Sequence, residues 1–333
     1  MTRRQWTEED VRIRPNRRGS RPRTKQRPRH ADAVTGMVLV VDRGRYVVRL
    51  AGGTRVRAMK ARELGRSSIV VGDDVDLVGD LSGRPDTLAR VVRVLERRTA
   101  LRRSADDTDA AERVMIANAD QLVVVTALAD PEPRPRMVDR CLVAAFDAGM
   151  DALLCLTKAD LADPAPFAGL YATLRVNAVP TVVRPGRIDG LDALRAELAG
   201  RMSVLVGHSG VGKSTLVNAL VPDAGRATGG VNETTGRGRH TSSAAVALEL
   251  PGGGWVIDTP GVRSFGLAHV DSDRLLAGFD DLAAAARDCP RGCTHLGEEC
   301  ALVDWADAHG EAGRARLASL RRLLVSREGG DEG

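Results

Sequence analysis

The order of two short motifs constrains this chain more than any other feature of its sequence. Residues 153–161 read LLCLTKADL, an apolar run that ends in a Thr-Lys-x-Asp tetrapeptide. Residues 205–216 read LVGHSGVGKSTL and contain the pattern G-x-x-x-x-G-K-[ST] of a phosphate-binding loop. A tetrapeptide that reads guanine ordinarily follows the phosphate loop, whereas here it precedes the loop. Any proposed fold has to accommodate this order.

The phosphate loop predicts how a nucleotide is held. Backbone amides of a glycine-rich turn and of the following helix N-terminus point at phosphate oxygens. Lys213 is placed to reach the β- and γ-phosphates, and the Ser214 hydroxyl to ligate Mg²⁺. His208 fills a permissive position. The predicted phosphate-binding residues are Gly207, His208, Ser209, Gly210, Val211, Gly212, Lys213, Ser214 and Thr215.

A second motif, WVIDTPG at residues 255–261, completes the phosphate end of the site. An apolar strand delivers Asp258, which can hold Mg²⁺ through a water, and the Gly261 amide can contact the γ-phosphate. Upstream, GGVNETTGRGRHTSS is a polar, glycine-rich loop suited to ordering around a nucleotide. Its Thr241, or failing that Ser242, is expected to complete the Mg²⁺ sphere.

Catalysis of hydrolysis has three candidate residues, Lys213, Thr241 and His240. Val262 follows DTPG and cannot hydrogen-bond, so another group must orient the attacking water. His240 has both a donor and an acceptor nitrogen and is the nearest candidate. The alternative for His240 is a contact with RNA or phosphate.

The tetrapeptide Thr157-Lys158-Ala159-Asp160 is interpreted as the guanine-reading segment. Asp160, at a strand's end, can accept hydrogen bonds from the guanine N1–H and N2–H₂, which adenine does not offer. The Lys158 stem can lie along the base. Alone, Lys-x-Asp is often only a solvated helix start, but here the other GTPase parts accompany it. Together the parts predict a GTPase with GTP or GDP and Mg²⁺ as ligands, in circularly permuted order.

Regular patterning predicts the architecture around these motifs. Four or five short β-branched runs from residue 35 predict a small barrel, with an OB-fold as the leading candidate. Strand and helix patterns then alternate, which predicts a parallel sheet covered by helices. The fold class is therefore α/β: a circularly permuted P-loop GTPase domain with an N-terminal OB-like β-barrel and a C-terminal helical zinc-binding domain. The predicted segments are a disordered basic tail (1–34), the barrel (35–100), the GTPase domain (101–270) and the zinc domain (271–333).

Charge is concentrated at the start of the chain. The first thirty residues hold eleven Lys or Arg and three acids, a net charge of +8, against +5 for the whole chain. Such a tail is either a solubilising extension or an arm that neutralises nucleic-acid phosphates. The barrel strands carry Arg45, Arg49, Arg55, Arg57 and Lys60 but only one aromatic, Tyr46, which favours contact with an RNA backbone over base stacking.

Three of the five cysteines lie within twelve residues, together with a histidine. Three thiolates and one imidazole suit tetrahedral Zn²⁺, and four protein ligands leave no open position, so we expect a structural zinc. The predicted ligands are Cys289, Cys293, His295 and Cys300. The helices around them include an arginine-rich one, with Arg314, Arg316, Arg321 and Arg322 facing either RNA or solvent.

Nothing in the sequence predicts a membrane segment. No apolar stretch approaches the roughly 20 residues needed to span a bilayer, and the Arg-rich start lacks the apolar part of a signal peptide. The cysteine pattern favours a reducing compartment, so we expect a cytoplasmic protein, and a monomer.

The combination of barrel, permuted motifs, GRGRHTSS, DTPGVRSFGL and the Cys/His cluster resembles the ribosome small-subunit-dependent GTPase A family from about residue 35 to 325. That resemblance implies a GTPase that binds the small (30S) ribosomal subunit and its 16S rRNA late in assembly. The chain departs from the family in two places. Val183-Arg184-Pro185 stands where the family tends to have a Ser-Ala loop, and both loops of the zinc motif are one residue shorter.

Two other functional classes remain open at this stage. One is a different P-loop enzyme, such as a small-molecule kinase, against which the tetrapeptide argues. The other is a nucleotide-gated RNA-binding module with negligible turnover, which differs only in whether RNA or the ribosome accelerates phosphate release.

Overall fold

The structure is a computed structural model that describes residues 30–65, 68–104, 112–222, 245–259, 267, 270, 272–277 and 279–328. Nearly all of these residues belong to one compact unit, Asp32–Gly333. Among the helices of the described ranges, none combines the length and the apolar character needed to cross a bilayer.

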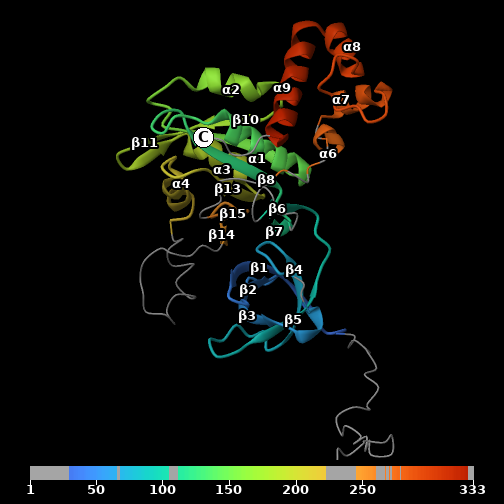
Figure 1. Ribbon diagram of the computed structural model, residues 1–333. Helices are drawn as coiled ribbons and strands as arrows, with labels where there is room; N and C mark the ends of the chain where they lie inside the picture. Colours follow the sequence, from blue (N-terminus) through green and yellow to red (C-terminus); the bar gives the residue numbers. More distant parts are fainter. Residues whose placement is uncertain are drawn as a thin grey trace, which may run out of the picture. The chain divides into compact units, whose positions relative to one another are not determined.

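Five strands at the start of this unit close into a barrel, which confirms the OB-like prediction (Figure 1). The strand order is β1-β2-β3-β5-β4, β4 pairs back to β1, and only β3–β5 is parallel. Alternation of apolar and polar residues places Val38, Val48 and Leu77 inside, fully buried. The strands are β1 Val34–Asp42, β2 Arg45–Leu50, β3 Arg55–Lys60, β4 Asp74–Gly79 and β5 Ala89–Val94.

A second set of strands forms the sheet that carries the phosphate loop. Its order is β10-β9-β8-β13-β15-β14, parallel throughout except for β14. The central strands are nearly continuous apolar runs, as expected for strands covered on both faces. They are β8 Gln121–Ala127, β9 Asp151–Thr157, β10 Asn177–Pro180, β13 Met202–Val206, β14 Val246–Glu249 and β15 Trp255–Asp258.

Helices cover both faces of this sheet. On one face α3 (Leu191–Leu198) and α4 (Lys213–Leu220) bury their leucines against β8, β13 and β15. The opposite face packs against α1 (Pro135–Asp147), α2 (Pro164–Ala172) and the C-terminal helices, all in one apolar cluster. The C-terminal helices are α6 Ser272–Ala277, α7 Asp280–Ala285, α8 Ala301–Ala308 and α9 Gly310–Glu328.

Short elements connect these parts. Two are hairpins, β6 (Ala100–Ser104) with β7 (Glu112–Ala117) and β11 (Val182–Arg184) with β12 (Arg187–Asp189). Two are 3-10 helices, Arg62–Leu64 and Ala286–Asp288. The sequence patterns did not indicate α2, α8 or the β6–β7 hairpin.

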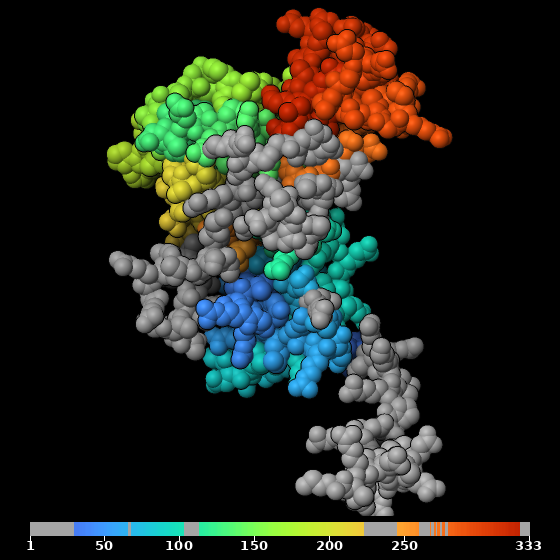
Figure 2. Space-filling model, in the orientation of Figure 1, coloured from blue at the N-terminus to red at the C-terminus, as the bar shows by residue number. Residues whose placement is uncertain are grey.

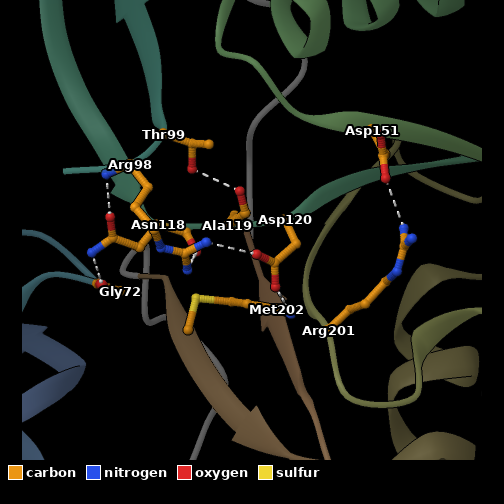
Figure 3. Close-up of polar contacts among 9 residues, drawn as sticks. All are labelled: Gly72, Arg98, Thr99, Asn118, Ala119, Asp120, Asp151, Arg201 and Met202. Atoms are coloured by element: carbon orange, nitrogen blue, oxygen red, sulfur yellow. Dashed lines mark hydrogen bonds and ion pairs between the residues drawn. The ribbon is translucent and has the colours of Figure 1, made fainter.

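The barrel joins the sheet through main-chain contacts. Val40 of β1 pairs with Val246 of β14, so barrel and sheet are continuous at this point. Nearby, Gly72 lies so close to Ala117 that a Cβ would be 2.0 Å from the Ala117 carbonyl oxygen. Asn118 donates to the Gly72 carbonyl at 2.9 Å and accepts from the Arg98 amide at 2.8 Å (Figure 3).

This joint continues to the strand that carries the phosphate loop. Arg98 donates to Asp120 Oδ1 at 3.1 Å, and Asp120 Oδ2 accepts from the amide of Met202, the first residue of β13 (Figure 3). A hydrogen-bonded chain therefore links a barrel loop to the start of β13.

Candidate functional site

The phosphate loop lies between β13 and α4, at the carboxyl end of the central strand. Gly207 approaches β8 so closely that a Cβ would be 2.4 Å from the Val125 carbonyl oxygen. Gly210 and Gly212 have φ values of 84° and 93°, in the left-handed region that favours glycine. The three glycines are therefore needed by the backbone path, and Val211 between them is fully buried.

Lys213 and Asp258 meet at the mouth of this loop. The Lys213 ammonium forms an ion pair with Asp258 Oδ1, which joins the first residue of α4 to the last residue of β15. Ser214 and Thr215 are exposed, as is Ser209. Thr259 is buried and donates to the Leu205 carbonyl at 2.7 Å, so it fixes the chain as it leaves β15; sequence reasoning missed this residue.

The tetrapeptide and the phosphate loop are in direct contact, although they are 54 residues apart in sequence. Thr157 ends β9 and is 5% exposed. Its hydroxyl donates to the Val211 carbonyl at 2.6 Å and lies 3.3 Å from the Thr126 carbonyl. Thr157 therefore points at the phosphate loop.

Lys158, Ala159 and Asp160 follow at the carboxyl end of the sheet. Lys158 has a φ of 55°, an uncommon conformation that marks functional turns. The Ala159 amide donates to the Thr181 carbonyl at 3.2 Å, which ties the tetrapeptide to the segment after β10. Asp160 is exposed, so its carboxylate is accessible to a ligand.

The loop after β8, residues 128–134, is a neighbour of both motifs that the sequence patterns did not indicate. The Lys158 ammonium donates to the Asp130 carbonyl and lies 4.0 Å from Asp130 Oδ2. A Cβ on Gly210 would lie 3.7 Å from Pro131 Cδ. Ligands bind at the carboxyl ends of parallel strands. The position of this loop directly after the β8 strand pattern could therefore have marked it as part of the site.

The segment after β10 forms the β11–β12 hairpin at the position where the family tends to have a Ser-Ala loop. Val183 and Arg184 belong to the β11–β12 hairpin, and Pro185 occupies its turn with Gly186, which has a φ of 75°. A turn position needs no ladder hydrogen bond, so the missing N–H of Pro185 is tolerated there. Thr181, 2% exposed, directly follows β10.

Several predicted site residues lie outside the described residues. They are His240, Thr241 and the fallback Ser242 in the glycine-rich loop, and Gly261 and Val262 after β15. Most of the basic tail lies outside as well. His208 is described: its Nδ1 is 2.9 Å from the Ser209 carbonyl oxygen, and its buried Nε2 has no partner among the described residues.

The four predicted zinc ligands converge. Their ligand atoms all lie within 4.8 Å of one another, and no cysteine of the chain forms a disulfide. Cys289 Sγ is 3.6 Å from Cys300 Sγ, and His295 Nδ1 is 3.7 Å and 3.5 Å from these two sulfurs. Zn–S bonds of about 2.3 Å give a tetrahedral S···S edge of about 3.8 Å. The shortened loops therefore still place the ligands at distances that fit zinc.

The surroundings of this cluster also fit a metal. Burial lowers the pKa of His295, which favours the neutral imidazole that binds metal. Burial raises the pKa of Cys300 to about 12, so its proton would have to be displaced by the metal. Arg321 donates to the carbonyls of His295 and Gly297 at 3.0 and 2.7 Å and holds the loop between the ligands.

The arginines of α9 correct the expectation that they face RNA or solvent. Of the four predicted arginines, only Arg314 does so; it is exposed and pairs with Asp307. Arg316 is 9% exposed, pairs with Asp281 and donates to the Thr173 carbonyl. Arg322 pairs with the buried Asp139 of α1. The helix had to bury one side against the sheet's helices, and these arginines satisfy the polar groups there.

A central parallel strand that feeds a phosphate loop, with the Thr-Lys-x-Asp segment two strands away and earlier in the chain, defines a circularly permuted P-loop nucleotide-binding domain. Residues 94–268 match the family model described as RsgA GTPase. Because this match covers more than half of the chain, and relatives match over most of their length, the chain belongs to the RsgA GTPase family.

Curated relatives of this chain bear the name "Small ribosomal subunit biogenesis GTPase RsgA", and three of them range from 34% to 44% identity with it. The Ectopseudomonas mendocina protein is 44% identical over 63% of this chain and 62% of its own length, so the chain matches less than two thirds of that relative. The Pseudomonas aeruginosa (strain LESB58) protein is 41% identical over 71% of this chain and 70% of its own length. The Chlorobaculum tepidum protein is 34% identical over 89% and 98%.

Two crystal structures share the fold. YjeQ from Thermotoga maritima superposes with a TM-score of 0.62 at 24% identity, over 90% of this chain and 99% of that one. YloQ, titled a circularly permuted GTPase, gives 0.64 at 22% identity, over 90% and 96%.

Proposed function

We propose that this protein hydrolyses GTP and acts as a late assembly factor of the small ribosomal subunit. The observation that carries the proposal is the contact of Thr157 with Val211, which brings a guanine-type tetrapeptide onto a phosphate loop. The names of the relatives, which describe small-subunit biogenesis GTPases, support the choice of partner.

Each part of the nucleotide has residues suited to it. Asp160 would accept hydrogen bonds from guanine, and Lys158 would lie along the base. The amides of residues 207–215 would surround the phosphates, with Lys213 exchanging its Asp258 partner for phosphate oxygens. Mg²⁺, when bound, would offset the phosphate charge, and its proposed ligands are Ser214, Thr241 and Asp258. Gly261 would donate its amide to the γ-phosphate.

For hydrolysis we propose that His240 orients the attacking water, since Val262 has no polar group. Lys213 and Thr241 would complete the catalytic set by stabilising charge on the transferred phosphoryl group. Without a partner, turnover should be slow, about 10⁻⁴ to 10⁻² s⁻¹ as for unassisted GTPases.

The barrel is the proposed RNA-facing surface. Arg45, Arg55 and Arg57 are exposed on the outer face of β2 and β3. Tyr46 is 6% exposed and is buried within the barrel, so base stacking on it is excluded. We propose that these arginines contact the phosphates of 16S rRNA, and that the protein works in the cytoplasm as a monomer with one structural zinc.

Turnover measured with isolated small and large subunits, side by side, tests the proposal. We expect small subunits alone to accelerate GTP hydrolysis. His240→Ala should keep GTP and subunit binding but lose most of the acceleration. Stimulation by large subunits only would overturn the assembly role, and ATP hydrolysis at a matching rate would favour a kinase-like enzyme.

A further inference from the structure

Arg322, in the C-terminal helix α9, contacts both helices that flank the guanine-type segment, residues 157–160. Arg322 Nε lies 3.2 and 3.0 Å from the two carboxylate oxygens of Asp139 in α1. Its Nη2 donates to the Leu170 carbonyl in α2 at 3.2 Å. The guanidinium also lies over the ring of Tyr171, 5.1 Å from its centroid. Figure 2 shows the red surface of the C-terminal region against the green surface of the sheet domain.

The two helices held by Arg322 begin next to the guanine-type segment. The loop that leads into α1 carries Asp130, whose carbonyl accepts from Lys158. The other helix, α2, starts at Pro164, four residues after Asp160, and Asp163 caps it by accepting from the Ala165 amide at 3.0 Å. A shift of either helix would therefore displace Lys158 or Asp160.

A further bond locks the two helices together. The Tyr171 hydroxyl, at the end of α2, donates to the carbonyl of Pro135, the first residue of α1, at 3.3 Å. Tyr171 is fully buried and Asp139 is 1% exposed. Burial raises the pKa of Asp139 to about 6, although Arg322 opposes the rise. A carboxylate in this setting depends on its arginine, because an unpaired buried charge is strongly unfavourable.

We propose that Arg322 is a positioning residue for guanine recognition: it holds α1 and α2 so that Lys158 and Asp160 are fixed before the base binds. This inference rests on the proposed binding of guanine nucleotides. It gives the C-terminal helix a role at the nucleotide site that does not require contact with the nucleotide.

The test compares three ligands in Arg322→Ala: GDP, IDP and pyrophosphate. IDP lacks the N2 amine that Asp160 would accept from, and pyrophosphate has no base. Coupling through packed elements is typically worth a factor of about 2 to 30, so we expect GDP to bind about tenfold more weakly. The ratio of GDP to IDP affinity should fall, while pyrophosphate affinity stays at the wild-type value.

Matched variants distinguish positioning from general damage. Arg314→Ala removes an exposed arginine of the same helix and should leave all three affinities unchanged. Arg322→Lys keeps the charge and should recover part of the GDP affinity. Tyr171→Phe deletes the hydroxyl that bonds Pro135 and interacts with Asp139, while it keeps the ring under Arg322. It should shift the GDP to IDP ratio in the same direction, which keeps the test valid if Arg322→Ala folds poorly.

Two results would overturn the inference. Unchanged GDP and IDP affinities in folded Arg322→Ala and in Tyr171→Phe would do so, as would an equal loss for GDP and pyrophosphate. If the wild-type chain binds no GDP, both the proposed function and this inference fail. If the wild-type chain binds GDP and the variants bind it equally well, only this inference fails.

Discussion

The barrel and the C-terminal helix α9 are attached to the same sheet in different ways. The barrel is joined by the main-chain pairing of β1 with β14 and by the close approach of Gly72 to Ala117, with the Arg49–Glu249 ion pair beside them. Helix α9 is joined by leucines of the shared core and by arginine side chains: Arg322 pairs with Asp139 of α1, and Arg316 donates to the Thr173 carbonyl after α2. A single substitution does not delete the main-chain pairing of β1 with β14, whereas it does delete an arginine side chain. The two attachments should therefore differ in how much a single substitution weakens them.

The largest loss of stability is expected at the predicted zinc site of the C-terminal region. Cys293→Ser should abolish zinc binding and unfold the ligand loops, because structural zinc contributes on the order of 10 kcal/mol. Helix α9 should remain docked, since Leu320 and Leu323 lie in the core shared with α1. We therefore expect lost zinc with nearly unchanged GDP affinity, measured by metal analysis and titration.

Cys141→Ala is the control for this variant, because Cys141 is a buried cysteine outside the cluster. It should keep its zinc. Reduced wild-type protein without zinc would contradict the assignment of the metal site.

A smaller loss of stability is expected from removing Arg97, which pairs with Asp73 beside the first residue of β4. Asp73 is fully buried and accepts from Arg97 Nε at 2.6 Å and from Arg97 Nη2 at 2.9 Å. Arg97→Ala would leave this buried carboxylate with the Val70 amide but without a charged partner, and should lower the free energy of unfolding by about 3–5 kcal/mol. Arg314→Ala is the control: Arg314 and its partner Asp307 are 58% and 66% exposed, so its loss should cost under about 1 kcal/mol. Equal losses in urea denaturation would disprove the distinction.

The smallest of these effects concerns the contact between the two motifs. Thr157→Val deletes the hydroxyl that donates to Val211 and leaves that carbonyl without its partner, which costs about 1–3 kcal/mol. We expect weaker binding of both GDP and pyrophosphate, because the phosphate loop itself loses support. Thr157→Ser keeps a hydroxyl and should bind nearly as wild type. Full affinity in Thr157→Val would show that the hydrogen bond does not support the loop.

The sequence was sufficient for the parts of the fold that depend on periodicity and on glycine. The barrel strands alternate apolar and polar residues, and the sheet strands are apolar runs. The backbone path of the phosphate loop requires glycine at positions 207 and 212. The spacing also predicted that Cys289, Cys293, His295 and Cys300 lie together, and their ligand atoms do converge.

Long-range side-chain partners could not be predicted in this way. Arg316 and Arg322 look like solvated arginines in the sequence, because their partners Asp281 and Asp139 lie 35 and 183 residues away. The role of Asp130 was hidden for the same reason: its contact with Lys158 exists only once β8 and β9 are neighbours. Pairing between distant residues follows from topology, which local patterns do not contain.

The central claim is that a segment before the phosphate loop reads guanine in this permuted domain. The most direct measurement is the affinity of wild type and Asp160→Asn for GDP and for xanthosine diphosphate. Hydrogen bonds to a charged acceptor are worth about 1.5–3 kcal/mol each, so Asp160→Asn should weaken GDP binding by roughly 100-fold. Xanthine presents an O2 acceptor that an amide can donate to, so the variant should prefer the xanthine nucleotide. Unchanged GDP affinity in Asp160→Asn would contradict the claim.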